Sequence, residues 1–117
     1  MNLTSVGNLS NKELSVFHLN VRNISKNYSE LFSFLCSLNI ELDVMVLSEI
    51  WCYNLELYCN AFPGYSFYCD VPHHTKVGGV GVYIKNCFSV NICDTLKLDS
   101  LNNVKVENIW LEVHRDN

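Results

Sequence analysis

The order of apolar segments in the first half of the chain constrains its fold more than any other feature. Leu14–Asn20 alternates in polarity like a half-buried strand, whereas Val44–Leu47 is continuously apolar, which is typical of a strand covered on both faces. Between them, apolar residues recur every three or four positions, which predicts an amphipathic helix over Lys26–Leu38, with N-cap candidates in Ser25–Ser29. A strand, a helix and a second strand predict a βαβ unit with parallel strands.

The rest of the chain predicts mainly strands. A Pro63-Gly64 turn precedes the first of them, and the strands are expected at Tyr65–Cys69, Val82–Ile84, Phe88–Cys93 and Asn108–Val113. The glycine-rich run Gly78–Gly81 predicts a strand bulge rather than a phosphate-binding loop, because no helix follows it. We therefore expect a loose polar leader over residues 1–13 and a single α/β (α+β) domain over residues 14–117.

Charge excludes one class of function. The 8 basic and 12 acidic residues give a net charge of −4, whereas proteins that bind nucleic acid through their overall field are basic. Any action on DNA must therefore depend on a local site or a bound metal ion.

The N-terminal sequence and the cysteines predict an intracellular protein of the nucleus or cytoplasm, not a secreted one. Residues Met1–Ser15 lack the basic start and apolar core of a signal peptide, and no apolar run approaches the length of a membrane helix, about 18 residues. The six cysteines show no CxxC spacing, and Cys69 with His73 and His74 fits no common zinc-finger pattern. We expect reduced thiols that are mostly buried.

Two oxygen-bearing side chains follow the predicted parallel strands. Asn20 ends the first strand, and Glu49 follows the second. Ligands of open α/β sheets gather at the carboxyl ends of strands, and an amide oxygen with a carboxylate suits Mg²⁺. Taken singly, Asn20 could instead be a turn or cap residue, and Glu49 an ordinary exposed carboxylate.

Six pieces of the chain, in order, resemble the endonuclease/exonuclease/phosphatase superfamily, and most closely the endonuclease domain of non-LTR (LINE-like) retrotransposons. They are Asn20–Arg22, the helix Lys26–Leu38, Asp43–Trp51, Phe62–Tyr65, Gly78–Lys85 and Glu107–Val113. The resemblance implies a four-layer α/β sandwich and a Mg²⁺-dependent phosphodiesterase that nicks DNA. It places Asn20 and Glu49 as metal-site residues and Arg22 as a neighbour of that site.

The same resemblance implies that the chain covers only the N-terminal half of such a domain. The acidic residues and the histidine that complete the family's catalytic site would lie in the missing C-terminal half, so we expect no catalytic residue here and no significant nuclease activity from the chain alone. Mg²⁺ binding would then be weak or absent. The sheet face carrying Val16, Val46, Val82 and Ile109 should lack part of its cover, which favours self-association. Alternatives are a fragment of a repair endonuclease or phosphatase of the superfamily, or a non-catalytic interaction module with this fold.

Overall fold

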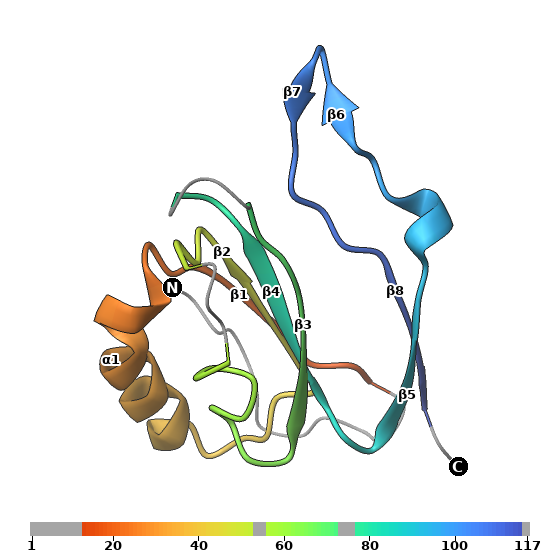
Figure 1. Ribbon diagram of the computed structural model, residues 1–117. Coiled ribbons are helices and arrows are strands. Elements are labelled where there is room, and N and C mark those ends of the chain that lie inside the picture. The colour runs from red at the N-terminus through yellow and green to blue at the C-terminus, as the bar shows by residue number, and fades with distance from the viewer. Residues whose placement is uncertain (1–12, 53–55, 73–76, 116–117) are drawn as a thin grey trace.

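One α-helix and eight short strands form the part of the chain described by the computed structural model, residues 13–52, 56–72 and 77–115 (Figure 1). The mixed α/β class predicted from the sequence is therefore confirmed. The predicted leader, residues 1–13, lies outside the described residues except for Glu13. No helix in the described part of the chain has the length and apolar character needed to cross a bilayer.

The predicted strand–helix–strand order is present at the start of the fold. It consists of β1 (Val16–Asn20), α1 (Ile24–Ser37) and β2 (Val44–Ser48). β1 and β2 are parallel neighbours, paired in register from Val16 opposite Val44 to Asn20 opposite Ser48. Both strands therefore end at the same edge of the sheet.

The helix begins earlier than predicted, and its cap was wrongly predicted. The N-cap is Asn23, whose side-chain oxygen accepts a hydrogen bond from the Lys26 amide at 3.3 Å, so the helix starts at Ile24 rather than at Lys26. Ser25 does not cap the helix but donates its hydroxyl to the same Asn23 oxygen at 2.8 Å. Several polar residues that could cap a helix precede the apolar repeat, so the first helical residue could not be identified from the sequence.

Two further strands complete the main sheet, with the order β1-β2-β4-β3. β4 (Val80–Lys85) is antiparallel to β2, and β3 (Tyr65–Asp70) is antiparallel to β4. A second antiparallel sheet pairs β5 (Phe88–Ile92) with β8 (Leu111–Arg115). These strands match the predicted ones to within a few residues.

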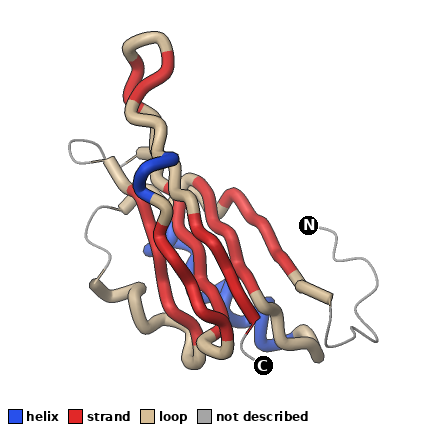
Figure 2. The backbone as a smooth tube through the Cα atoms, turned by 90° about the vertical axis from the view of Figure 1, so that its right-hand side faces the viewer, coloured by secondary structure: helices blue, strands red, loops and turns tan. Residues whose placement is uncertain are grey.

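The connection between β5 and β8 contains elements that the sequence analysis missed. They are the short 3-10 helix η1 (Asp94–Leu96) and the hairpin β6 (Ser100–Leu101) and β7 (Val104–Lys105), which projects from the body of the molecule (Figure 2). Asn102 and Asn103 form its tip with φ of 52° and 64°. Consecutive Asn residues tolerate this left-handed conformation, and that signal could have revealed the hairpin.

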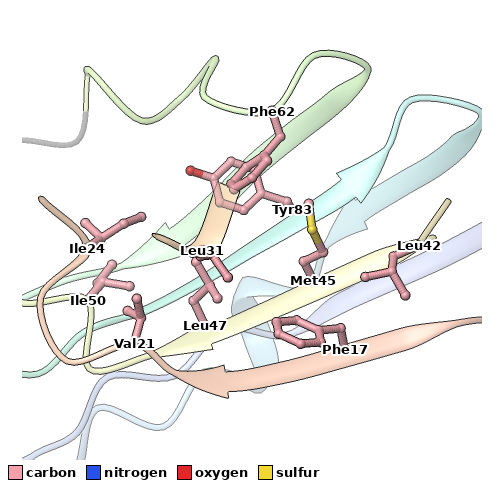
Figure 3. Close-up of a cluster of buried hydrophobic side chains, with 10 residues drawn as sticks. All are labelled: Phe17, Val21, Ile24, Leu31, Leu42, Met45, Leu47, Ile50, Phe62 and Tyr83. Atoms are coloured by element: carbon pink, nitrogen blue, oxygen red, sulfur yellow. The ribbon is translucent and has the colours of Figure 1, made fainter. Parts of the chain in front are cut away.

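The main sheet is covered on both faces. α1 and the segment that precedes β3 cover one face, where a large apolar cluster forms around Leu47, Ile50 and Tyr83 (Figures 1 and 3). In that cluster the Phe62 and Tyr83 rings meet edge to face, with centroids 4.7 Å apart. The opposite face packs on the β5–β8 sheet through Val44, Val82, Ile84 and Phe88.

The apolar cluster between the main sheet and the β5–β8 sheet is incompletely covered. A groove of about 520 Å³ separates the main sheet from β8. Val16 lines it with 52% of its surface exposed, whereas Val82 is only 7% exposed. The expected loss of cover is therefore observed at Val16 and is wrong for Val82, because the second sheet shields the centre of this face.

The expectation of buried thiols is also wrong. Four of the six cysteines are exposed, and Cys52 and Cys93 are half-buried. Cys69 is one of the exposed four, on the edge strand β3, but partial desolvation of its thiol raises the pKa above the ordinary value.

We predict that Leu47→Ala lowers the free energy of unfolding by about 3 kcal/mol, because it removes a fully buried side chain from the first cluster. Leu57→Ala is the matched control, since Leu57 is 80% exposed and its truncation should change stability by less than about 0.5 kcal/mol. Urea unfolding followed by circular dichroism measures both. Equal losses in the two variants would contradict the assignment of this core.

A second prediction concerns Tyr65, whose hydroxyl donates to the Leu42 carbonyl at 2.5 Å. Burial, and then the nearby carboxylates of Glu41 and Asp43, raise the pKa of Tyr65 from 10.0 to about 12. The folded state thus holds this proton more tightly than the unfolded state, so stability should be full below pH 10 and fall between pH 10 and 12. In Tyr65→Phe the urea midpoint should decline less over that interval than in the wild type. An identical decline would show that Tyr65 does not contribute to it.

Candidate metal site at the carboxyl ends of β1 and β2

The two predicted ligands lie at the same edge of the main sheet. Asn20 is the last residue of β1 and pairs with Ser48, and Glu49 follows Ser48 directly. Adjacent strands lie about 4.8 Å apart, so these residues come from neighbouring backbones. Asn20 is exposed and Glu49 is half-buried, so neither side chain is enclosed by the apolar core.

Asn20 belongs to the sheet face that borders the groove. Side chains of a strand alternate between faces, so Asn20 shares its face with His18 and Val16. His18 Nε2 lies 3.3 Å from Ser48 Oγ on the same face. Asn20 therefore shares this face with His18 and with its β2 partner Ser48.

Glu49 is held in an unusual backbone conformation. Its φ is 56°, and that of Trp51 is 51°, in the left-handed region that costs a non-glycine residue about 1–2 kcal/mol. The Trp51 indole Nε1–H donates to Glu49 Oε2 at 2.5 Å, so the side chain of Trp51 orients the carboxylate. This role of Trp51 was not predicted from the sequence; its spacing of two residues from Glu49 was the available signal.

Backbone hydrogen bonds join the turn after β1 to the segment after β2. Val21 N–H donates to the Ser48 carbonyl at 2.9 Å, and Asn23 N–H to the Glu49 carbonyl at 2.9 Å. Ile24 N–H continues the series to the Ile50 carbonyl at 3.0 Å. The turn that follows Asn20 and the backbone of Glu49 therefore form one connected unit.

Arg22 lies inside this turn. Its φ is 48°, it is exposed, and its carbonyl accepts a hydrogen bond from Asn27 Nδ2 at 2.8 Å. Arg22 thus lies in the turn that follows Asn20, at the same edge of the sheet as Glu49. Its side chain is available to solvent there.

The glycine pair forms a turn that supports Glu49 from the other side. Gly78 and Gly79 both have φ of 92° and precede β4, so the predicted strand bulge is replaced by a left-handed turn outside the strand. Their carbonyls accept hydrogen bonds from Trp51 N–H at 3.0 Å and Ile50 N–H at 3.4 Å, respectively. Gly81 alone lies within the strand, against the Phe67 ring.

Glu107 closes this turn and was missed by the sequence analysis. Its Oε1 accepts a hydrogen bond from Gly79 N–H at 3.0 Å, across 28 residues of sequence. A Cβ at Gly78 would lie 2.4 Å from the same oxygen, so the carboxylate occupies the space that a side chain would need. Only its position directly before the predicted alternating strand Asn108–Val113 could have singled it out.

The site's oxygen donors suit a hard cation but do not enclose one. Among residues 13–52, 56–72 and 77–115, no three His, Cys, Asp or Glu side chains are close enough to hold a metal ion together. Asp70 lies at the same edge but already binds Lys97 at 3.2 Å and the Asn108 amide at 2.9 Å. Mg²⁺ retains several waters and commonly uses one or two carboxylates, so Asn20 and Glu49 could form part of its coordination shell. His73 and His74 of the rejected zinc set lie outside the described residues.

The chain matches no protein-family model and no curated protein. Function is therefore inferred from the residues and geometry of the site.

We predict that Gly78→Ala destabilises the fold more than Gly64→Ala. Both glycines have left-handed φ, 92° and 87°, so each substitution should cost about 1 kcal/mol through the backbone. A Cβ at Gly64 meets nothing within 4 Å, whereas one at Gly78 displaces the Glu107 carboxylate and its hydrogen bond, adding about 1 kcal/mol. Urea unfolding gives both values. Equal losses would mean that the Glu107 contact contributes nothing to stability.

Proposed function

We propose that the chain is the N-terminal part of a Mg²⁺-dependent DNA endonuclease domain of the non-LTR retrotransposon kind, within the endonuclease/exonuclease/phosphatase superfamily. One observation carries this proposal: β1 and β2 are parallel neighbours that end side by side with Asn20 and, one residue further, Glu49. The motif resemblance predicts metal ligands at these two positions, and the fold brings their backbones to one edge of one sheet.

The chemistry assigns these residues part of a reaction. Hydrolysis of a phosphodiester needs a cation on a phosphoryl oxygen, a base for the attacking water, and stabilisation of the leaving oxygen. Asn20 and Glu49 would hold the cation, and Arg22 would add positive charge near a phosphate. A positioned general base accounts for about 10²–10⁴ in rate. Because the resemblance assigns that base to the missing half, we expect no significant nicking by this chain alone.

The groove offers a place for the missing half. It is apolar along Val16, Val46 and Leu111, and it opens between the main sheet and β8. Side chains from additional strands of the β5–β8 sheet would fill it and complete a four-layer sandwich. Without them, a second copy of the chain could cover the same face, so self-association would compete with completion of the domain.

Two other functions fit the same architecture. A repair endonuclease or a phosphatase of the superfamily would use the same two metal ligands, and the missing half would determine the substrate. A non-catalytic interaction module that reuses this fold is the second alternative. The test below separates catalysis from a module.

We predict that the chain nicks supercoiled plasmid only when combined with the C-terminal half of a related retrotransposon endonuclease domain, and only with Mg²⁺. The added half supplies the base, and this chain supplies two ligands of the cation. Conversion of supercoiled to open-circular DNA on agarose gels measures the activity. Glu49→Ala should lower it by at least about 10²-fold, as expected for loss of electrostatic stabilisation in the transition state.

Glu30→Ala is the matched control, because Glu30 is an exposed glutamate on α1. It should leave nicking unchanged. Full nicking by Glu49→Ala would contradict the proposed role of the site. A well-folded complex of the two halves that does not nick DNA would favour the interaction module.

A further inference from the structure

We infer that Glu107 is a positioning residue for Glu49, acting through the Gly78–Gly79 turn. The inference rests on the proposed function, because it assigns Glu49 a metal to hold. It adds a residue from the far end of the chain to the support of the site, one that neither strand of the βαβ unit contains.

The first link is the contact between Glu107 and Gly79. Glu107 lies between β7 and β8, is half-buried, and lines the groove between the two sheets. Its Oε1 accepts the Gly79 N–H at 3.0 Å and fills the space beside Gly78. Partial burial of both groups makes this bond harder to replace with water than one on the open surface.

The second link passes from the glycine turn to the segment after β2. The Gly78 and Gly79 carbonyls accept hydrogen bonds from Trp51 N–H and Ile50 N–H. Ile50 is fully buried, and its side chain packs so closely on Gly79 that a Cβ there would lie 2.9 Å from Ile50 Cγ1. A displacement of the turn would therefore displace residues 50 and 51.

The third link is the carboxylate itself. Trp51 donates its indole N–H to Glu49 Oε2, and both residues hold left-handed backbone conformations that are costly without external support. Loss of the Glu107 contact should let this segment relax. The Glu49 carboxylate would then lose its fixed orientation.

Two conservative substitutions separate positioning from direct metal binding. Glu107→Gln keeps the length of the side chain and an oxygen acceptor but removes the charge. Glu107→Asp keeps the charge but is one methylene too short to hold Gly79 in the same place. Positioning through the hydrogen bond predicts that Gln behaves like the wild type and Asp like Ala, whereas direct coordination predicts the reverse.

The test is a Mn²⁺ titration of the whole chain, with free Mn²⁺ measured by electron paramagnetic resonance. We expect Glu107→Ala and Glu107→Asp to weaken Mn²⁺ binding about tenfold, as is usual when a residue supporting a metal ligand is lost. Glu107→Gln and the control Glu30→Ala should bind like the wild type, and Glu49→Ala should not bind. Amide hydrogen exchange in the same proteins should accelerate at Ile50, Trp51 and Gly79 in the Ala and Asp variants only.

The outcomes distinguish the inference from the proposed function. Wild-type Mn²⁺ binding that persists unchanged in Glu49→Ala overturns the proposed function and the inference with it. Loss of binding in Glu49→Ala with unchanged binding in Glu107→Ala overturns the inference alone. A Glu107→Gln protein that fails like Glu107→Ala overturns positioning in favour of a charge effect. Faster amide exchange throughout the chain, rather than at these three amides, would mean that Glu107 stabilises the whole fold. That result also overturns the inference.

Discussion

The parallel pairing of β1 and β2 is the constraint on which the rest of the site depends. A parallel pair brings two carboxyl ends to one edge, so residues 28 or 29 positions apart in the chain become neighbours. Hydrogen bonds then extend this pairing past the strand ends, from Val21, Asn23 and Ile24 to the carbonyls of Ser48, Glu49 and Ile50. The start of α1 is part of the same network, because Asn23 both caps the helix and binds the Glu49 carbonyl.

The concentration of strained backbone at this edge has a physical cause. Four non-glycine residues with positive φ lie within the two connected turns: Arg22, Asn23, Glu49 and Trp51. Such conformations persist where surrounding contacts determine them, and they cluster at functional sites. Here the supports are the backbone hydrogen bonds between the two turns, the Gly78–Gly79 turn and the indole of Trp51. They fix the direction of one carboxylate that could otherwise rotate freely in water.

Sequence patterns could predict the elements whose burial is periodic. Val44–Leu47 is apolar throughout because Met45 and Leu47 face α1 while Val44 and Val46 face the second sheet. The alternation of Ile109, Leu111 and Val113 likewise reflects packing on one face. Asn20 and Glu49 could be singled out because they follow such segments. The residues that support Glu49 could not be predicted in this way. The Glu107–Gly79 contact spans 28 residues, and the left-handed turns depend on tertiary hydrogen bonds.

The most direct test of the central claim is a Mg²⁺ titration followed by nuclear magnetic resonance of the Asn20 side-chain amide and the Trp51 indole N–H. If Asn20 and Glu49 share one cation, both signals should shift with the same dissociation constant, and both shifts should disappear in Glu49→Gln. Shifts of the Trp51 signal without the Asn20 signal, or shifts of both that persist in Glu49→Gln, would contradict a shared metal site.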